Sequence, residues 1–216
     1  MMKLTVEPTL IDLKSDPLYK ADTQPVLVEV PEMPFVAVDG VGAPTSEEGE
    51  SDFQQALQVL FTIIYTVKFW DKKHTAPEGY AKFSMPPLEA MWWSEQGDPF
   101  GTSDTSAWHW RAMLRVPDFV DEAFFREVLQ EVMTQKADKA FQLAHFERIK
   151  EGPALQILHV GPYDEEKRSV DALLEYSKRE SLTVDGKHHE LYFSDPRRTA
   201  PDKLKTIIRY PVKSRR

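Results

Sequence analysis

The sequence contains no cysteine, 9 glycines in 216 residues and no long run of apolar side chains. Without cysteine, disulfides, thiolate catalysis and cysteine-based zinc sites are excluded. The few glycines are scattered and form neither a phosphate-cradling loop nor a dinucleotide fingerprint. Since no apolar segment is long enough for a signal peptide or a membrane span, we expect a cytoplasmic protein.

Positive charge is also scarce, because the formal net charge is −8. A nucleic acid is usually bound by a basic face, and two short basic clusters, Arg197-Arg198 and residues 213–216, are interpreted as surface groups. The hydrophobic content of 41% is enough to build the core of a globular domain. We therefore expect neither a nucleic-acid partner nor a membrane partner, while the sequence leaves the oligomeric state open.

A loose internal repeat organises the chain. A strand-like run at residues 35–38 leads to Gly40-Val41-Gly42, and a second run at residues 156–159 leads to Val160-Gly161-Pro162. Each is followed by acidic residues, which the helix dipole favours, and then by apolar residues at three- and four-residue spacing. The sequence therefore predicts a helix after each strand.

Two further strand candidates follow each of these helices. In the first half, Met113-Leu114-Arg115-Val116-Pro117 resembles Ile207-Ile208-Arg209-Tyr210-Pro211 in the second half. Residues 146–158 are typical of a hairpin that enters the second half, and residues 119–136 predict a connecting helix. We expect a single domain made of an N-terminal extension (1–25), a first βαββ unit (26–117), a connecting helix (118–145) and a second βαββ unit (146–212).

Two segments carry a resemblance to a known family. Residues 158–166 read Leu-His-Val-Gly-Pro-Tyr-Asp-Glu-Glu, and residues 189–198 read His-Glu-Leu-Tyr-Phe-Ser-Asp-Pro-Arg-Arg, continuing in the same manner to Val212. From about residue 26 to residue 212 the chain resembles the stand-alone GyrI-like (gyrase-inhibitor-like) small-molecule-binding proteins. The resemblance is strongest over residues 155–212.

The resemblance implies an α+β fold in which two βαββ units are related by a pseudo-twofold axis. It implies an antiparallel sheet with helices on one face and a ligand groove between the halves. The same family supplies effector domains of multidrug-sensing regulators, in which a buried glutamate and aromatic residues hold cationic drugs. Some stand-alone members resemble hydrolases of cyclopropane-bearing, DNA-alkylating natural products. With twenty-five residues before its first expected strand, this chain is expected to lack the DNA-binding domain of the regulators.

Glu190 is the candidate catalytic residue, because it is an acidic side chain in a segment that otherwise resembles a buried strand. An uncompensated buried carboxylate costs several kcal/mol, so it calls for a ligand, a proton or a cationic partner. Alternation along the strand places Tyr192 on the same side as Glu190 and His189 on the other, so these two neighbours cannot easily share an ion. His159 and His188 are interpreted as strand residues without a ligand-spaced partner. We expect no metal and no cofactor.

Aromatic side chains are the candidate ligand-binding residues. Trp93 is predicted to share a face with Glu89, which is interpreted as structural, and Trp108 is predicted to share a face with Trp110. Such rings suit the stacking of flat ligands. The full set of candidates is Phe61, Tyr65, Trp93, Trp108, Trp110, Tyr163 and Tyr192.

Two functions remain open from the sequence. In the first, Glu190 activates a water that opens a strained ring of an aromatic ligand, while a tyrosine hydroxyl binds the carbonyl that gains charge. In the second, the protein is a non-catalytic module that binds or sequesters planar aromatic or lipophilic compounds, neutral or cationic, with Glu190 as the counter-charge.

Overall fold

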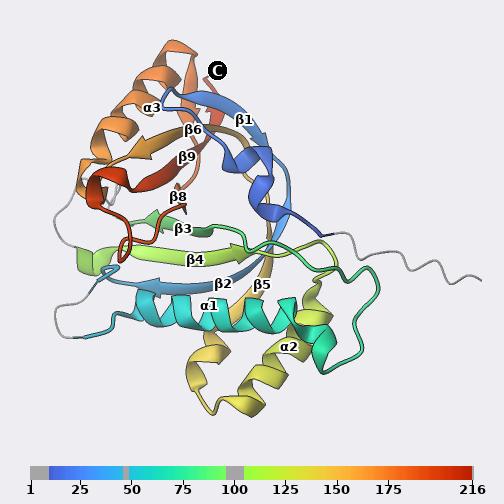
Figure 1. The fold of residues 1–216 in the computed structure, drawn as a ribbon. Coiled ribbons are helices and arrows are strands. Elements are labelled where there is room, and N and C mark those ends of the chain that lie inside the picture. The colour runs from blue at the N-terminus through green and yellow to red at the C-terminus, as the bar shows by residue number, and fades with distance from the viewer. Residues whose placement is uncertain (1–9, 46–48, 96–104, 216) are drawn as a thin grey trace, which may run out of the picture.

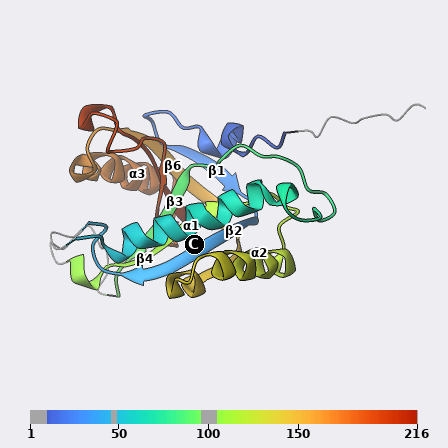
Figure 2. The ribbon, with the colours of Figure 1, turned by 60° about the horizontal axis from the view of Figure 1, so that its bottom comes forward.

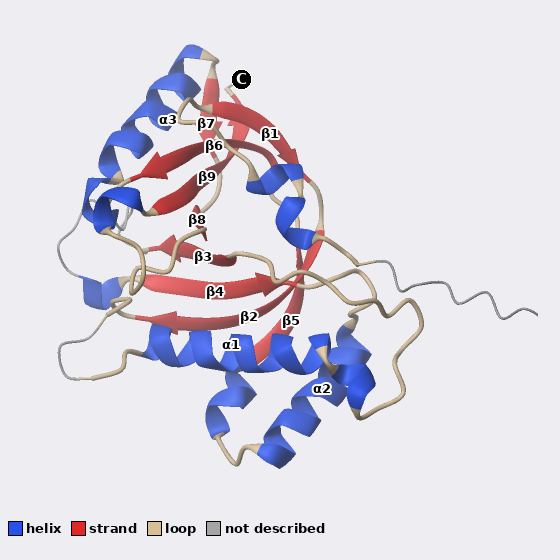
Figure 3. Ribbon diagram, viewed as in Figure 1, coloured by secondary structure: helices blue, strands red, loops and turns tan. Residues whose placement is uncertain are grey.

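A computed structural model describes residues 10–45, 49–95 and 105–215. Three α-helices lie in these ranges: α1 (Asp52–Lys68), α2 (Glu122–Gln135) and α3 (Lys167–Arg179). The strands are β1 (Val26–Val30), β2 (Met33–Val41), β3 (Leu88–Trp93), β4 (His109–Arg115), β5 (Ala144–Ile149), β6 (Gly152–Val160), β7 (Leu182–Val184), β8 (His188–Tyr192) and β9 (Lys205–Ser214). They form one bent antiparallel sheet in the order β1-β6-β9-β8-β3-β4-β2-β5, with β7 paired to β9 (Figures 1 and 3).

Two βαββ units build this sheet and meet at its centre. The first is β2-α1-β3-β4 and the second is β6-α3-β8-β9, with the short β7 inserted after α3. Each unit places its last strand between its other two, and β3 of the first unit pairs with β8 of the second. The predicted α+β fold with two related units is therefore confirmed, and β4 and β9, to which most of the similar segments 113–117 and 207–211 belong, are the last strands of their units.

The two units share their outer strands. Val30 of β1 pairs with Gly152 of β6, and Met33 of β2 pairs with Ile149 of β5, so the register is unchanged across the bend. Consequently β1 with β2, and β5 with β6, form two long bent strands. These two strands pair with each other on both sides of the bend. The predicted hairpin at residues 146–158 is wrong, since β5 and β6 pair with other strands; Gly152 has a φ of 69°, which suits the sharp bend there.

Helix α1 covers the β2–β4 half of the sheet (Figure 2). Its N-terminus is closed by a capping box between Ser51 and Gln54. The predicted apolar spacing is confirmed, because residues at three- and four-residue intervals are buried: Phe53, Ala56, Val59, Leu60, Ile63, Ile64 and Val67. Helix α2 packs beside α1, and it begins after the capping residue Asp121 rather than at residue 119 as predicted.

Helix α3 covers the β6–β9 half of the same face. Its buried residues Val170 and Leu173 pack on the strands, and its outer surface is charged. The short turn Tyr163–Glu165 precedes it, so Glu166 lies at the helix start. This position places the acidic side chain of the N-cap residue next to β8 at the centre of the sheet.

Part of the N-terminal segment packs on the sheet. Residues 17–19 form a turn of 3₁₀-helix that packs against the sheet face opposite α1 and α3, with Tyr19 5% exposed. Asp16 pairs with Arg115 of β4 at 2.7 Å. Among the described residues, no helix combines the length and the apolar character that crossing a membrane requires.

Candidate functional site

Strand β8 alternates between the two faces of the sheet. Glu190 pairs with Ala90, and His188 pairs with Trp92, both of which belong to the core beneath α1. His188, Glu190 and Tyr192 therefore point to the helix-covered face, as the alternation predicted for Glu190 and Tyr192. His189 points to the opposite face.

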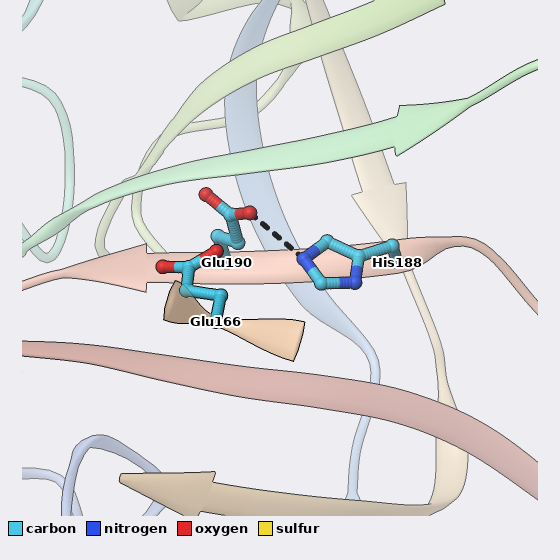
Figure 4. A group of neighbouring side chains, drawn as sticks. All are labelled: Glu166, His188 and Glu190. Carbon is cyan, nitrogen blue, oxygen red and sulfur yellow. Dashed lines mark hydrogen bonds and ion pairs between the residues drawn. The ribbon is translucent and has the colours of Figure 1, made fainter. Parts of the chain in front are cut away.

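Glu190 is held by a hydrogen bond from His188. The His188 Nε2 to Glu190 Oε1 distance is 2.8 Å, and because an ionised carboxylate only accepts, the imidazole donates (Figure 4). The other ring nitrogen, Nδ1, lies 2.6 Å from the hydroxyl of Tyr210 on β9. Glu190 and His188 are 5% and 3% exposed, so this series of hydrogen bonds is buried at the junction of the two units.

Glu166 is the second carboxylate of the site. One possible ligand atom from each of Glu166, His188 and Glu190 lies within 4.8 Å of the other two, and we call these three residues the helix-face cluster (Figure 4). Glu166 is 4% exposed, and its Oε1 is buried without a hydrogen-bond partner among the described residues. Burial, followed by the negative charge of Glu190, raises the pKa of Glu166 to about 11.

The environment shifts the pKa values of the two carboxyl groups in opposite directions. Although burial opposes it, the hydrogen bond from His188 and the charge of His188 lower the pKa of Glu190. Glu190 is therefore ionised and Glu166 is neutral near pH 7. Two carboxyl groups driven apart in this way form a potential base and a potential acid.

Aromatic side chains surround the helix-face cluster. The indole Nε1 of Trp92 donates to the hydroxyl of Tyr192 at 3.1 Å, and Trp108 packs edge-on against Trp92. Tyr163 meets Tyr192 edge-on with ring centroids 6.1 Å apart and is 39% exposed, so it connects this region with the surface. Burial, then the charge of Glu190, raises the pKa of Tyr192 well above its usual value, so its hydroxyl keeps its proton.

Two predicted ligand-binding tryptophans lie elsewhere. Trp93 is on the face opposite Glu190, where it stacks on His109 and carries the Lys187 ammonium 3.3 Å above its ring. Trp110 is on the helix face but is 1% exposed, because its indole packs directly over Gly40, where an added Cβ would lie 2.1 Å from the ring. Trp93 therefore lies on the side of Glu89, as predicted, and away from Glu190, whereas Trp92 and Trp110 lie on the side of Glu190.

Phe61 and Tyr65 line a surface cavity of about 1070 Å³ beside α1. The loop after β8 closes one side of it through Asp195 and Arg197, and Glu190 is not among its lining residues. Tyr65 is 49% exposed and stacks on Phe69. The structure thus divides the predicted aromatic residues between this cavity and the neighbourhood of Glu190.

The opposite face contains a second buried polar group, which we call the opposite-face network: Tyr19, Glu89, Glu151, His189 and Arg209. His189 lies 3.0 Å from both Glu89 and Glu151, and Arg209 lies 3.2 Å from Glu151. Tyr19 donates to Glu89 at 2.7 Å. Against the effect of burial, the charge of His189 lowers the pKa of Glu151 to about 2, and Glu151 raises the pKa of His189 to about 9.

The helix-face cluster has enough donor atoms for a metal ion, as carboxylates and a histidine can bind one. However, the His188–Glu190 hydrogen bond already occupies the atoms that an ion would need. The absence of a metal stays a prediction.

Sequence reasoning missed Glu166, His188 and Tyr210. His188 was interpreted as lacking a partner, which is wrong, because Glu190 lies two residues further along the same strand face. That two-residue spacing was the available signal. Glu166 resembles an ordinary acidic residue of a helix start, and its approach to β8 is a tertiary contact without a sequence signature.

The chain belongs to the family of the GyrI-like small molecule binding domain, whose family model matches residues 23–213. The family is thus one of small-molecule-binding proteins, as the resemblance indicated. No curated protein matches the sequence.

Solved structures agree with this assignment. A hydrolase from Listeria innocua is 37% identical, with a TM-score of 0.83, over 94% of this chain and 100% of that one. An uncharacterized conserved protein from Listeria innocua is 39% identical, with a TM-score of 0.85 and the same coverage. The C-terminal domain of EcmrR is 13% identical, with a TM-score of 0.52, over 88% of this chain and 98% of that one, and it shares the fold.

Proposed function

We propose that the protein binds planar aromatic or lipophilic small molecules and hydrolyses those that carry a strained, electrophilic ring, such as a cyclopropane conjugated to a carbonyl. Glu190 acts as the general base. The water oxygen bonds to a ring carbon, the carbon–carbon bond breaks, and its electron pair moves to the carbonyl. Glu190 takes a proton from the water, and the carbonyl oxygen gains a proton to become a hydroxyl.

The observation that carries this proposal is a buried Glu190 that accepts a hydrogen bond from His188 and lies next to a second buried carboxyl group, Glu166. A positioned general base contributes about 10²–10⁴-fold in rate. Tyr163 and Tyr192 lie beside it with protonated hydroxyls, and either could donate to the carbonyl. The similarity to a hydrolase from Listeria innocua supports the same reaction type.

A second function, binding without turnover, is favoured by one of the same observations. An ionised Glu190 is a suitable counter-charge for a cationic aromatic compound. This function needs no proton transfer, so a measurement of turnover distinguishes binding alone from hydrolysis.

The test is incubation with a cyclopropane-bearing alkylator, followed by mass measurement of the small molecule. EDTA is included because we expect no metal to be needed. We expect catalytic gain of one water with the wild type and with Glu175→Gln, an exposed control on α3. Glu190→Gln should lower kcat by about 10²–10⁴-fold while neutral aromatic ligands still bind. Retained turnover in Glu190→Gln would remove Glu190 as the base, and an unchanged compound with the wild type would favour the binding function.

A further inference from the structure

Glu166 is a buried acid that the proposed base mechanism does not use. Its backbone is fixed by the first turn of α3, because the N–H groups of Ser169 and Val170 donate to its carbonyl oxygen at 2.9 and 3.0 Å. Its side chain faces Glu190 across the junction between α3 and β8 (Figure 4). The groups that act on it are Glu190 and the hydroxyl of Thr206, neither of which is a cation.

Two carboxylates that share one buried pocket cannot both be ionised. Glu190 receives the hydrogen bond from His188, which favours its charged form, so the proton belongs on Glu166. The N-terminus of α3 favours a charged Glu166, but such an effect is about 1 kcal/mol. Removing a lone carboxylate from water costs several kcal/mol, so the effect of burial exceeds that of the helix dipole and keeps Glu166 neutral.

The buried Oε1 of Glu166 also has no hydrogen-bond partner among the described residues. Such an atom costs about 1–3 kcal/mol unless a ligand or a solvent molecule satisfies it. A bound molecule that reaches this oxygen would supply the missing partner next to the base.

From this juxtaposition we infer that Glu166 is the proton donor of the site and that Glu166 and Glu190 act as one acid–base pair. The inference rests on the proposed function and deepens it. As water adds to the ring carbon, Glu190 takes the water's proton, and Glu166 gives its own proton to the carbonyl oxygen that receives the electron pair of the broken bond. The pair then holds one proton on Glu190, and its transfer to Glu166 restores the starting state. The net reaction adds one water.

The first measurement needs no substrate. In EDTA-treated protein labelled with ¹³C at the glutamate side-chain carboxyl, we expect one signal of a protonated carboxyl group at pH 7. It should disappear in Glu166→Gln and remain in Glu165→Gln, the exposed neighbouring control. A protonated signal that persists in Glu166→Gln, or none in the wild type, overturns the inference.

The second measurement is turnover of the cyclopropane-bearing alkylator. Glu166→Gln should lower kcat by about 10²–10⁴-fold with KM within a few-fold, and should remove the alkaline limb of the pH–rate profile. Glu166→Asp keeps an acid and should keep part of the turnover, which distinguishes proton donation from misfolding. Wild-type kcat in Glu166→Gln overturns the inference. A wild type that leaves the alkylator intact contradicts the proposed function and the donation step, while the carboxyl signal still decides whether the pair stores the proton.

Discussion

Strand β8 carries two adjacent histidines that belong to two different buried clusters. On the opposite face, His189 and Arg209 provide two cations for Glu89 and Glu151, so that each carboxylate lies within 3.2 Å of a cation. On the helix face, the two carboxyl groups of Glu166 and Glu190 lie near one histidine, His188, which forms its hydrogen bond with Glu190.

The two clusters differ in what their burial achieves. A balanced network neutralises its own charges and ties the N-terminal segment to the sheet, because Arg209 also donates to the Leu18 carbonyl at 2.8 Å. The helix-face cluster has an excess of acid, which costs stability but creates groups with separated proton affinities. Charge balance separates the two clusters, and each prediction below tests whether it also separates a structural role from the proposed catalytic one.

Arg209→Met should have the largest effect on stability. It leaves Glu151 buried with one cation fewer, and breaking a buried ion pair costs about 3–5 kcal/mol. Urea denaturation measures the change in the free energy of unfolding. Arg179→Met on the exposed side of α3 should change it by less than about 0.5 kcal/mol. A small loss at Arg209 would show that the opposite-face network does not stabilise the fold.

His189 should make stability depend on alkaline pH. Because its folded pKa is about 9 and its ordinary value is 6.5, its contribution is full below pH 6.5 and is lost as the pH rises through 9. The loss is about 3 kcal/mol. Urea denaturation at pH 6 and pH 9.5 should show this decline in the wild type and in the half-buried control His145→Gln, and a flatter dependence in His189→Gln. Equal slopes in all three would contradict the assignment.

Glu166→Gln should change stability in the other direction. A carboxyl group with a raised folded pKa binds its proton more tightly in the folded state, so its contribution is full below pH 4.5 and decreases above it. Replacement by an amide removes that decrease. We expect a Tm increase of about 2–4 °C at pH 8, corresponding to about 1 kcal/mol, and a smaller increase at pH 5. A lower Tm at pH 8 would indicate that Glu166 is structural.

Tyr210→Phe should have the smallest effect. It removes the hydroxyl that lies against His188 and leaves the ring in place, which costs about 1 kcal/mol in a neutral hydrogen bond. We expect kcat to fall by a few-fold, since the orientation of His188 is loosened, with Tyr176→Phe as the control. A loss as large as that of Glu190→Gln would make Tyr210 part of the proton-transfer machinery.

Local periodicity predicted more of the fold than of the site. The spacing of Phe53, Leu60 and Ile64 predicted α1 correctly, and two-residue alternation correctly placed Glu190 and Tyr192 on one face. The choice between Trp92 and Trp93 depends on the register of β3 against β8, which no local pattern records. The same limitation explains the wrong hairpin at residues 146–158, since β5 pairs with β2 and β6 pairs with β1, each more than a hundred residues earlier in the chain.

The unbroken register of the two long bent strands has a consequence for biosynthesis. Val26 pairs with Gln156, so the earliest strand to leave the ribosome finds its neighbour only after most of the chain has been made. Such distant pairings slow folding because a long loop must close first. The sheet of the second half therefore needs β1 from the first half, and the two halves are joined at the centre only when β8 has been synthesised and pairs with β3.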